Sequence, residues 1–262
     1  MTWTSSWVGE ATPCPATTTD DPMTNDKPVG AEAFSPTRSD PRAGRADNTR
    51  LDRVARTTYS AVFSDACDRV GLRHQTLDPD IRPQTGTGLT LVGWARVARF
   101  VSVDTPPSRP YGNEIDFIDS LQPGDVVVLC GPGDRAALWG ELFSAASRAR
   151  GARGAVIDGL MRDQERVAQL DFAVYARGSQ PSDSLGRVSL QAPGSPVVVG
   201  GVRVSDGDLV VADVDGVVAV PATAALDVMA LAVEKASVER TALALVREGA
   251  LLAEAWERFG VL

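Results

Sequence analysis

Two short segments restrict the fold more than any other feature of this chain. Both are almost wholly apolar and rich in β-branched residues: DVVVLCG at 125–131 and GAVIDG at 154–159. Runs of this length and composition are typical of strands buried on both faces, as in a parallel sheet covered by helices. A helical stretch at about 136–150 lies between them. The pattern therefore predicts an α/β fold.

The rest of the chain adds strands and helices to this unit. Alternating small and large residues predict one long strand or two within 91–103, and 195–221 has the composition of several strands joined by tight Gly and Asp turns. Further strands are predicted at 172–178 and 187–193. Helices are predicted at about 113–121, 136–150 and 162–170, and as a long C-terminal pair broken at Gly249. Because strands are more frequent in the second half than strict alternation would give, we expect an α/β sandwich rather than a barrel.

The first fifty residues differ from the remainder in composition. They are rich in Thr, Ser, Pro, Asp and Gly and hold few large apolar residues, which predicts a disordered or loosely packed N-terminal extension over residues 1–50. Met23 within it is an alternative start. Helical periodicity begins near Leu51, so the predicted folded domain is a single unit over 51–262. One helical face is expected to carry Val62, Phe63, Ala66 and Val70, with Gly71 ending the helix.

The composition excludes several classes of partner. The chain has 44% hydrophobic and 23% charged residues, as globular proteins have, and its formal charge of −8 lacks the basic excess that favours nucleic-acid binding. No stretch approaches the roughly 18 apolar residues that span a membrane, and no secretory signal pattern is present. Three scattered cysteines, Cys14, Cys67 and Cys130, indicate reduced thiols. We therefore expect a cytoplasmic protein with neither a nucleic-acid nor a membrane partner.

The single histidine, His74, restricts the possible chemistry. A Ser-His-Asp or Cys-His device would have to use it, and so would a zinc site built on imidazoles. Its place after a predicted helix C-terminus favours a structural role instead, because a cation is stabilised there by the helix dipole. The GPGDRA segment at 131–136 is interpreted mainly as a turn, since it lacks the other glycines and the lysine of phosphate-binding loops. An enzyme with this sequence would use carboxylates, Arg and a hard metal ion.

Three charged residues are predicted to meet at one edge of the sheet. A helix from Glu141 to residue 150 covers about 14 Å, and the strand that follows returns about 16 Å. Glu141 should therefore lie beside Arg162 and Asp163, at the carboxyl end of the strand, where open α/β folds bind ligands.

The residue types suit a 2-oxo acid held on a divalent metal. Mg²⁺ prefers oxygen ligands and keeps several waters, so Asp163 could bind it directly and Glu141 through water. Arg162 offers a planar fork for a carboxylate. The free N–H groups near Leu142 and Phe143, at the helix start, could bind another anionic oxygen. The alternative is a surface ion pair in which Asp163 only caps the helix that follows it.

The segments around this cluster resemble a known enzyme family. WGELFSAASRARGARGAVIDGLMRD (139–163) and GGVRVSDGDLVVADVDGVVAVP (200–221) resemble the 4-hydroxy-4-methyl-2-oxoglutarate / 4-carboxy-4-hydroxy-2-oxoadipate aldolase family. That family shares its fold with the regulator of ribonuclease activity A. The resemblance runs from about residue 55 to the C-terminus. The family's catalytic signature is an acidic residue, twenty intervening residues and Arg-Asp, which Glu141 and Arg162-Asp163 meet because residues 142–161 number twenty.

The resemblance implies a fold, a reaction and a set of roles. The fold would be the swivelling β/β/α sandwich, RraA-like and similar to phosphohistidine domains. The protein would be a class II pyruvate aldolase that uses Mg²⁺ or Mn²⁺ and also decarboxylates oxaloacetate. Asp163 would bind the metal, Glu141 would act through metal-bound water, and Arg162 would contact the substrate. The amides of Leu142 and Phe143, with Gly140 before them, would bind the pyruvyl carboxylate. A homotrimer or homohexamer would place Glu239 of a neighbouring subunit at the metal.

Two other functions remain open at this point. One is a regulator of the same fold that binds a ribonuclease and has no catalytic activity, although such a protein would not need the three charged residues. The other is a related lyase of a specialised pathway that uses the same metal–enolate chemistry on another oxo acid. The sequence does not identify the distal half of the small-molecule substrate.

Overall fold

A computed structural model describes residues 47–86, 88, 90–132 and 136–261. The predicted N-terminal extension falls almost entirely outside these residues, as do residues 133–135 of the GPGDRA segment. The helices are α1 (Asn48–Thr57), α2 (Ser60–Arg69), α3 (Gly112–Asp119), α4 (Glu141–Ala149), α5 (Gln164–Ala168), α6 (Ala225–Arg247) and α7 (Leu252–Phe259). The strands are β1 (Arg82–Thr85), β2 (Leu91–Ser102), β3 (Asp125–Cys130), β4 (Ala137–Trp139), β5 (Gly154–Met161), β6 (Ala173–Ser179), β7 (Val188–Gln191), β8 (Val197–Val199), β9 (Val202–Val204), β10 (Leu209–Asp213) and β11 (Gly216–Val220).

Over the described residues the strands form one nine-stranded sheet and a separate β8–β9 pair. The main path of the large sheet is β1-β6-β5-β3-β2-β10-β11, with β4 paired to β5 and β7 paired to β2. The central strands β2, β3, β5 and β6 run parallel to one another. The flanking strands β1, β7, β10 and β11 pair antiparallel. The two apolar segments that predicted buried parallel strands are β3 and β5, which lie side by side.

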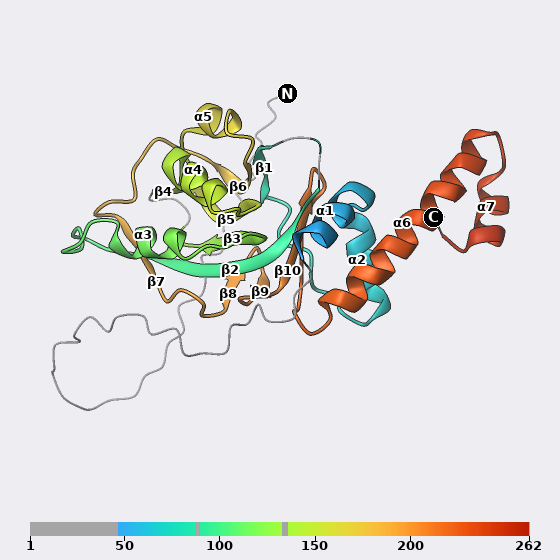
Figure 1. Ribbon diagram of the computed structural model, residues 1–262, viewed down its shortest axis with the longest axis horizontal. Coiled ribbons are helices and arrows are strands. Elements are labelled where there is room, and N and C mark those ends of the chain that lie inside the picture. The colour runs from blue at the N-terminus through green and yellow to red at the C-terminus, as the bar shows by residue number, and fades with distance from the viewer. Residues whose placement is uncertain (1–46, 87, 89, 133–135, 262) are drawn as a thin grey trace, which may run out of the picture.

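Layers on both sides explain why these strands are apolar throughout. Figure 1 shows α3, α4 and α5 over one face of the sheet, and β8 and β9 against the other. Each layer encloses its own hydrophobic cluster. A third cluster joins α1, α2 and α6 to β2, β10 and β11. This β/β/α layering confirms the predicted α/β sandwich.

The region before α4 differs from its prediction. The helix expected at about 136–150 begins only at Glu141, and Ala137–Trp139 forms β4 instead. The reason is tertiary: β4 adds to the end of β5 in parallel, with Trp139 opposite Met161, and all three β4 residues are buried. The extended backbone of Gly140 then separates the strand from the helix.

The N-terminal helices also differ in part. Val62, Phe63 and Ala66 are buried in α2 as predicted, but Val70 is 43% exposed because it forms the C-cap of α2 rather than a turn inside it. The C-terminal helices α6 and α7 meet near Gly249, as predicted, and extend away from the sheet (Figure 1). Among the described residues, none of the helices has both the length and the apolar character required to cross a bilayer.

Candidate active site

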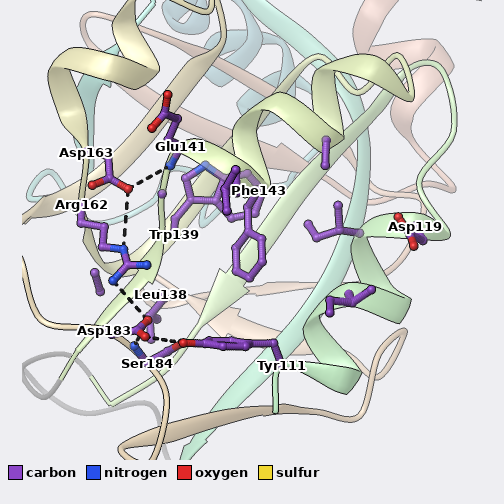
Figure 2. Close-up of a pocket in the computed structure, with 16 residues that line it drawn as sticks. Tyr111, Asp119, Leu138, Trp139, Glu141, Phe143, Arg162, Asp163, Asp183 and Ser184 are labelled. Atoms are coloured by element: carbon purple, nitrogen blue, oxygen red, sulfur yellow. Dashed lines mark hydrogen bonds and ion pairs between the residues drawn. The ribbon is translucent and has the colours of Figure 1, made fainter. Parts of the chain in front are cut away.

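A pocket of about 600 Å³ lies between α3, α4 and the end of β5. Every residue of this chain that the sequence placed at the site lines it, with the exception of Glu239: Gly140, Glu141, Leu142, Phe143, Arg162 and Asp163. Figure 2 shows Glu141, Arg162 and Asp163 gathered at one end. The expected convergence of helix start and strand end is therefore present.

Strand pairing between β4 and β5 brings the two segments together. The N–H of Arg162 donates to the carbonyl of Trp139 at 2.9 Å, which continues the β4–β5 ladder by one residue beyond Met161. The chain therefore enters α4 directly beside the point where it leaves β5. Across this junction the N–H of Glu141 donates to Oδ2 of Asp163 at 3.3 Å. The predicted proximity thus depends on a short strand that the sequence did not reveal.

Gly140 permits the close approach at this junction. A Cβ atom added to Gly140 would lie 2.9 Å from Oδ2 of Asp163 and 3.2 Å from Cγ of Arg162. Any other residue here would push the carboxylate or the arginine stem aside. Gly140 therefore sets the space in which the two charged side chains lie.

Asp163 does not act as the helix cap that the alternative interpretation requires. It precedes α5, but its side chain makes no capping hydrogen bond there. Its backbone is left-handed, with φ 60° and ψ 31°, a conformation that is uncommon for a residue with a Cβ and is concentrated at functional sites. The turn directs the carboxylate away from its own helix and to the N-terminus of α4, where the dipole of that helix stabilises negative charge.

Arg162 lies between two carboxylates. Its Nε is 3.6 Å from Oδ2 of Asp163, and its Nη1 is 3.2 Å from Oδ1 of Asp183. Asp183 also accepts hydrogen bonds from the hydroxyl of Tyr111 and, at 2.8 Å, from the N–H of Ser184 (Figure 2). The guanidinium is therefore held at both sides, while 38% of its side chain remains exposed toward the pocket.

The environment of Asp183 favours its charged form. Burial alone would raise the pKa of this carboxyl, but the hydrogen bond from Tyr111, the charge of Arg162 and backbone N–H groups together lower the pKa below its ordinary value. The same hydrogen bond to Asp183, followed by burial and the carboxylate charge, raises the pKa of Tyr111. An ionised Asp183 and a neutral Tyr111 together form a fixed support for Arg162.

Tyr111 and Asp183 are pocket residues that sequence reasoning missed. Tyr111 precedes α3 in a left-handed conformation with φ 56°, and Asp183 lies between β6 and β7. Both fall in Pro-, Ser- and Gly-containing segments, which predict turns. Their spacing from Arg162 carries no signal, because the three residues meet only through the tertiary fold.

The carboxylates at the pocket fit a hard cation that keeps most of its water. No group of three or more His, Cys, Asp or Glu side chains with metal-ligand placement exists among the described residues. Glu141 and Asp163 both line the pocket, and the Glu141 N–H donates to the Asp163 carboxylate. Mg²⁺ commonly binds proteins through one or two carboxylates with waters completing its shell. Glu141 forms an ion pair with Arg166, whose Nη1 lies 3.9 Å from Oε2, a weak surface contact.

Glu239 lies elsewhere in the chain. It is on α6, where its carboxylate accepts from Nζ of Lys235 at 3.0 Å and from the hydroxyl of Tyr59. It does not line the pocket of its own chain. A role for Glu239 in the pocket of a neighbouring subunit stays a prediction.

The other end of the pocket is mainly apolar, with Asp119 as its charged residue (Figure 2). Its wall comes from α3 and α4 and from the strand before α4. Leu142 is 80% exposed and Ile115 is 43% exposed at this surface. Phe143 packs against Trp139 with ring centroids 5.7 Å apart. The pocket thus combines a charged end with an apolar wall.

Comparison with known proteins identifies the family. A family model described as RraA-like (Aldolase/RraA) matches residues 60–219. The chain belongs to this RraA-like family. The match covers the sheet, the pocket and α4, and it ends before α6.

Individual members of the RraA-like family carry different names. A Halalkalibacterium halodurans protein provisionally named a 4-hydroxy-4-methyl-2-oxoglutarate aldolase is 30% identical over 174 residues, which cover 63% of this chain and 74% of that protein. Legionella pneumophila protein DlpA is 26% identical over 62% of this chain, which spans only 26% of DlpA. The crystal structure of Streptomyces coelicolor RraAS2, described as an unusual member of the RNase ES inhibitor RraA protein family, has a TM-score of 0.65 and 28% identity. The alignment covers 75% of this chain and 98% of RraAS2. Because these names include both an enzyme and an inhibitor, the function of this chain has to be inferred from the geometry of its pocket.

Proposed function

We propose that the protein is a divalent-metal-dependent lyase that cleaves a 4-hydroxy-2-oxo acid to pyruvate and a second carbonyl compound. Decarboxylation of oxaloacetate is the accompanying activity, because it also breaks a bond to C3 of a 2-oxo acid. Mg²⁺ or Mn²⁺ bound beside Asp163 and Glu141 supplies Lewis-acid stabilisation of the negative charge that develops on the 2-oxo oxygen.

Residues of the chain bind the substrate and accept its proton. Arg162 binds the substrate carboxylate or oxo group through a guanidinium that Asp163 and Asp183 hold in place. The N–H groups of Leu142 and Phe143 belong to the first turn of α4, whose amides have no acceptor within the helix. They take the remaining anionic oxygen of the pyruvyl carboxylate. Glu141 accepts the proton of the C4 hydroxyl through a water molecule.

The reaction balances without a further reactant. The C4 hydroxyl loses its proton as the C3–C4 bond breaks, and C4 becomes a carbonyl. The electron pair of that bond moves toward C3 and the 2-oxo oxygen, which gives the enolate of pyruvate. Protonation at C3 then gives pyruvate. In oxaloacetate, carbon dioxide leaves in place of the carbonyl compound.

The single observation that supports this proposal is the junction of Asp163 with the start of α4. Asp163 adopts a left-handed backbone conformation, leaves its own helix uncapped and reaches the N–H of Glu141 at 3.3 Å across a glycine. A protein that only binds a partner surface has no need for this arrangement inside a pocket.

Pyruvate release from oxaloacetate tests the proposal. We expect turnover with Mg²⁺, loss of turnover with EDTA, and loss of turnover in Asp163→Ala. Turnover that persists in EDTA or in Asp163→Ala would reject the mechanism.

The second candidate function is inhibition of a ribonuclease, favoured by the likeness to RraAS2. It predicts tight binding to a ribonuclease and no pyruvate release from any oxo acid. Binding that is unchanged in Asp163→Ala, together with an absence of turnover in the wild-type protein, would support this function over the lyase.

A further inference from the structure

The pocket is larger than the pyruvyl half of any substrate requires. Its volume of about 600 Å³ is typical of sites that enclose much larger ligands. The charged residues occupy one end, where Figure 2 places Glu141, Arg162 and Asp163. The rest of the pocket must therefore receive whatever is attached to C4 of the substrate.

This remaining part presents apolar side chains from two neighbouring helices. Ile115 and Ile118 come from α3, and Leu142, Phe143 and Ala146 come from α4. Large apolar side chains as exposed as Leu142, at 80%, and Ile115, at 43%, mark ligand or partner surfaces when they gather beside a polar site.

The charges around the pocket disfavour a second carboxylate on the substrate. Of the lining residues that the structure describes, Arg162 is the one cation, against the four carboxylates of Asp119, Glu141, Asp163 and Asp183. Arg162 is already assigned to the 2-oxo acid end. At the distal end a carboxylate would meet Asp119 and, among the described lining residues, would lose its hydration without gaining a cation.

A nearby arginine does not change this balance. Arg150 lies next to Asp119 but does not line the pocket, and its charge is paired with the Asp119 carboxylate. Its Nη2 donates to the Asp119 carboxylate, its Nε to the Asp119 carbonyl at 3.3 Å, and its Nη1 to the Ala146 carbonyl at 3.2 Å. Arg150 thus joins the end of α3 to α4 and adds no cation to the pocket lining that the structure describes.

We infer that the α3–α4 wall is a subsite for an apolar C4 substituent. The preferred substrates are 4-hydroxy-2-oxo acids that carry an alkyl or aryl group beyond C4 and yield pyruvate and an uncharged aldehyde or ketone. Oxo acids with a second carboxylate at that end are poor substrates. The inference rests on the proposed lyase activity and names its substrate class.

A pair of substrates of equal length tests the inference. 4-Hydroxy-2-oxoheptanoate ends in a methyl group and gives pyruvate and butanal, whereas 4-hydroxy-2-oxoheptanedioate ends in a carboxylate and gives pyruvate and succinic semialdehyde. We expect kcat/KM of the wild-type protein with Mg²⁺ to be at least about tenfold higher for the first, because burial of one apolar carbon group is worth about tenfold or more, whereas the carboxylate in its place would lose hydration.

Lysine variants test whether the preference for the alkyl substrate arises from the α3–α4 wall. Ile115→Lys places a cation on α3 and is expected to reduce the ratio of the two kcat/KM values to about one or to invert it. Leu142→Lys provides a second such variant on α4, at a side chain exposed enough to tolerate the change. The matched control is Val214→Lys, which adds the same charge at a 75%-exposed apolar residue that does not line the pocket. Its ratio should equal that of the wild type.

The outcomes separate this inference from the proposed function. If the wild-type protein releases pyruvate from oxaloacetate but cleaves the dioic acid as well as the alkyl substrate, the subsite is wrong and the lyase stands. If the alkyl substrate is preferred but both lysine variants keep the wild-type ratio, the wall is not the origin of the preference and the inference fails. If no oxo acid yields pyruvate, both the lyase and the subsite are rejected.

Discussion

The substitution Gly140→Ala gives the sharpest test of how the site is built. The Cβ atom would lie 2.9 Å from Oδ2 of Asp163, so the carboxylate must move by about 0.5 Å to regain ordinary contact distance. The backbone of Gly140 is extended, with φ −168°, so alanine itself fits. Alanine should therefore move the Asp163 carboxylate without straining the backbone at position 140.

Stability and activity should consequently respond very differently to Gly140→Ala. Alanine restricts the unfolded chain but is a poorer N-cap than glycine, so the free energy of unfolding should change by about 1 kcal/mol or less. This corresponds to a shift in Tm of about 2–4 °C. A misplacement of about 1 Å can reduce a rate about 100-fold, so we expect kcat/KM for pyruvate release to fall about 10- to 100-fold.

A double-mutant cycle supplies the control for Gly140→Ala. Mn²⁺ affinity is measured by electron paramagnetic resonance, and pyruvate release by coupling to lactate dehydrogenase. If alanine acts by pushing Asp163 aside, it should weaken Mn²⁺ binding in the wild-type background but not further in Asp163→Ala. Fully additive effects, or an unchanged kcat/KM with an unchanged Tm, would refute the role assigned to the glycine.

Three further predictions follow from the pocket. Asp183→Asn should raise KM for oxaloacetate and lower kcat/KM about tenfold, because it removes one charged partner of Arg162. Tyr111→Phe should have a smaller effect in the same direction. A loss of Tm in parallel with the loss of activity would indicate that these residues have a purely structural role. The pKa of Asp183 is lowered in the folded protein, since its hydrogen bond from Tyr111 and the charge of Arg162 outweigh burial. Its stabilisation should therefore be fully present above the ordinary carboxyl pKa of about 4 and should be lost as pH falls through the lower folded value. Urea unfolding should then show the wild-type advantage over Asp183→Asn constant near neutral pH and shrinking below about pH 4; an advantage that grows in acid would contradict the assigned direction. Removal of divalent ions with EDTA should abolish pyruvate release, and excess Mg²⁺ or Mn²⁺ should restore it, whereas failure of both metals to restore activity would argue against a reversibly bound ion.

The strands that build the site were predictable from local composition. β3 and β5 are short, apolar and β-branched, and burial on both faces leaves few other options for such segments. The placement of Glu141 at the same edge of the sheet as Arg162 and Asp163 followed from the matching lengths of one helix and one strand. These features depend on neighbouring parts of the chain, so the sequence carries them directly.

Features that depend on contacts between distant segments were not predictable. Ala137–Trp139 is too short to show a strand period, and its conformation is fixed by pairing with the end of β5. The left-handed turn at Asp163 and the support of Arg162 by Asp183 and Tyr111 likewise arise from the assembled fold. A capping role for Asp163 was an alternative that the spacing left open until its side-chain direction was known.

The most direct test of the central claim is the initial rate of pyruvate formation from a 4-hydroxy-2-oxo acid by the wild-type protein and by Asp163→Asn at saturating Mg²⁺. The substitution keeps the shape of the side chain, removes its charge and replaces one carboxylate oxygen by an NH2 group. A fall of at least about 100-fold with an unchanged Tm is the expected result. A rate within about twofold of the wild type would show that the carboxylate of Asp163 has no part in the chemistry.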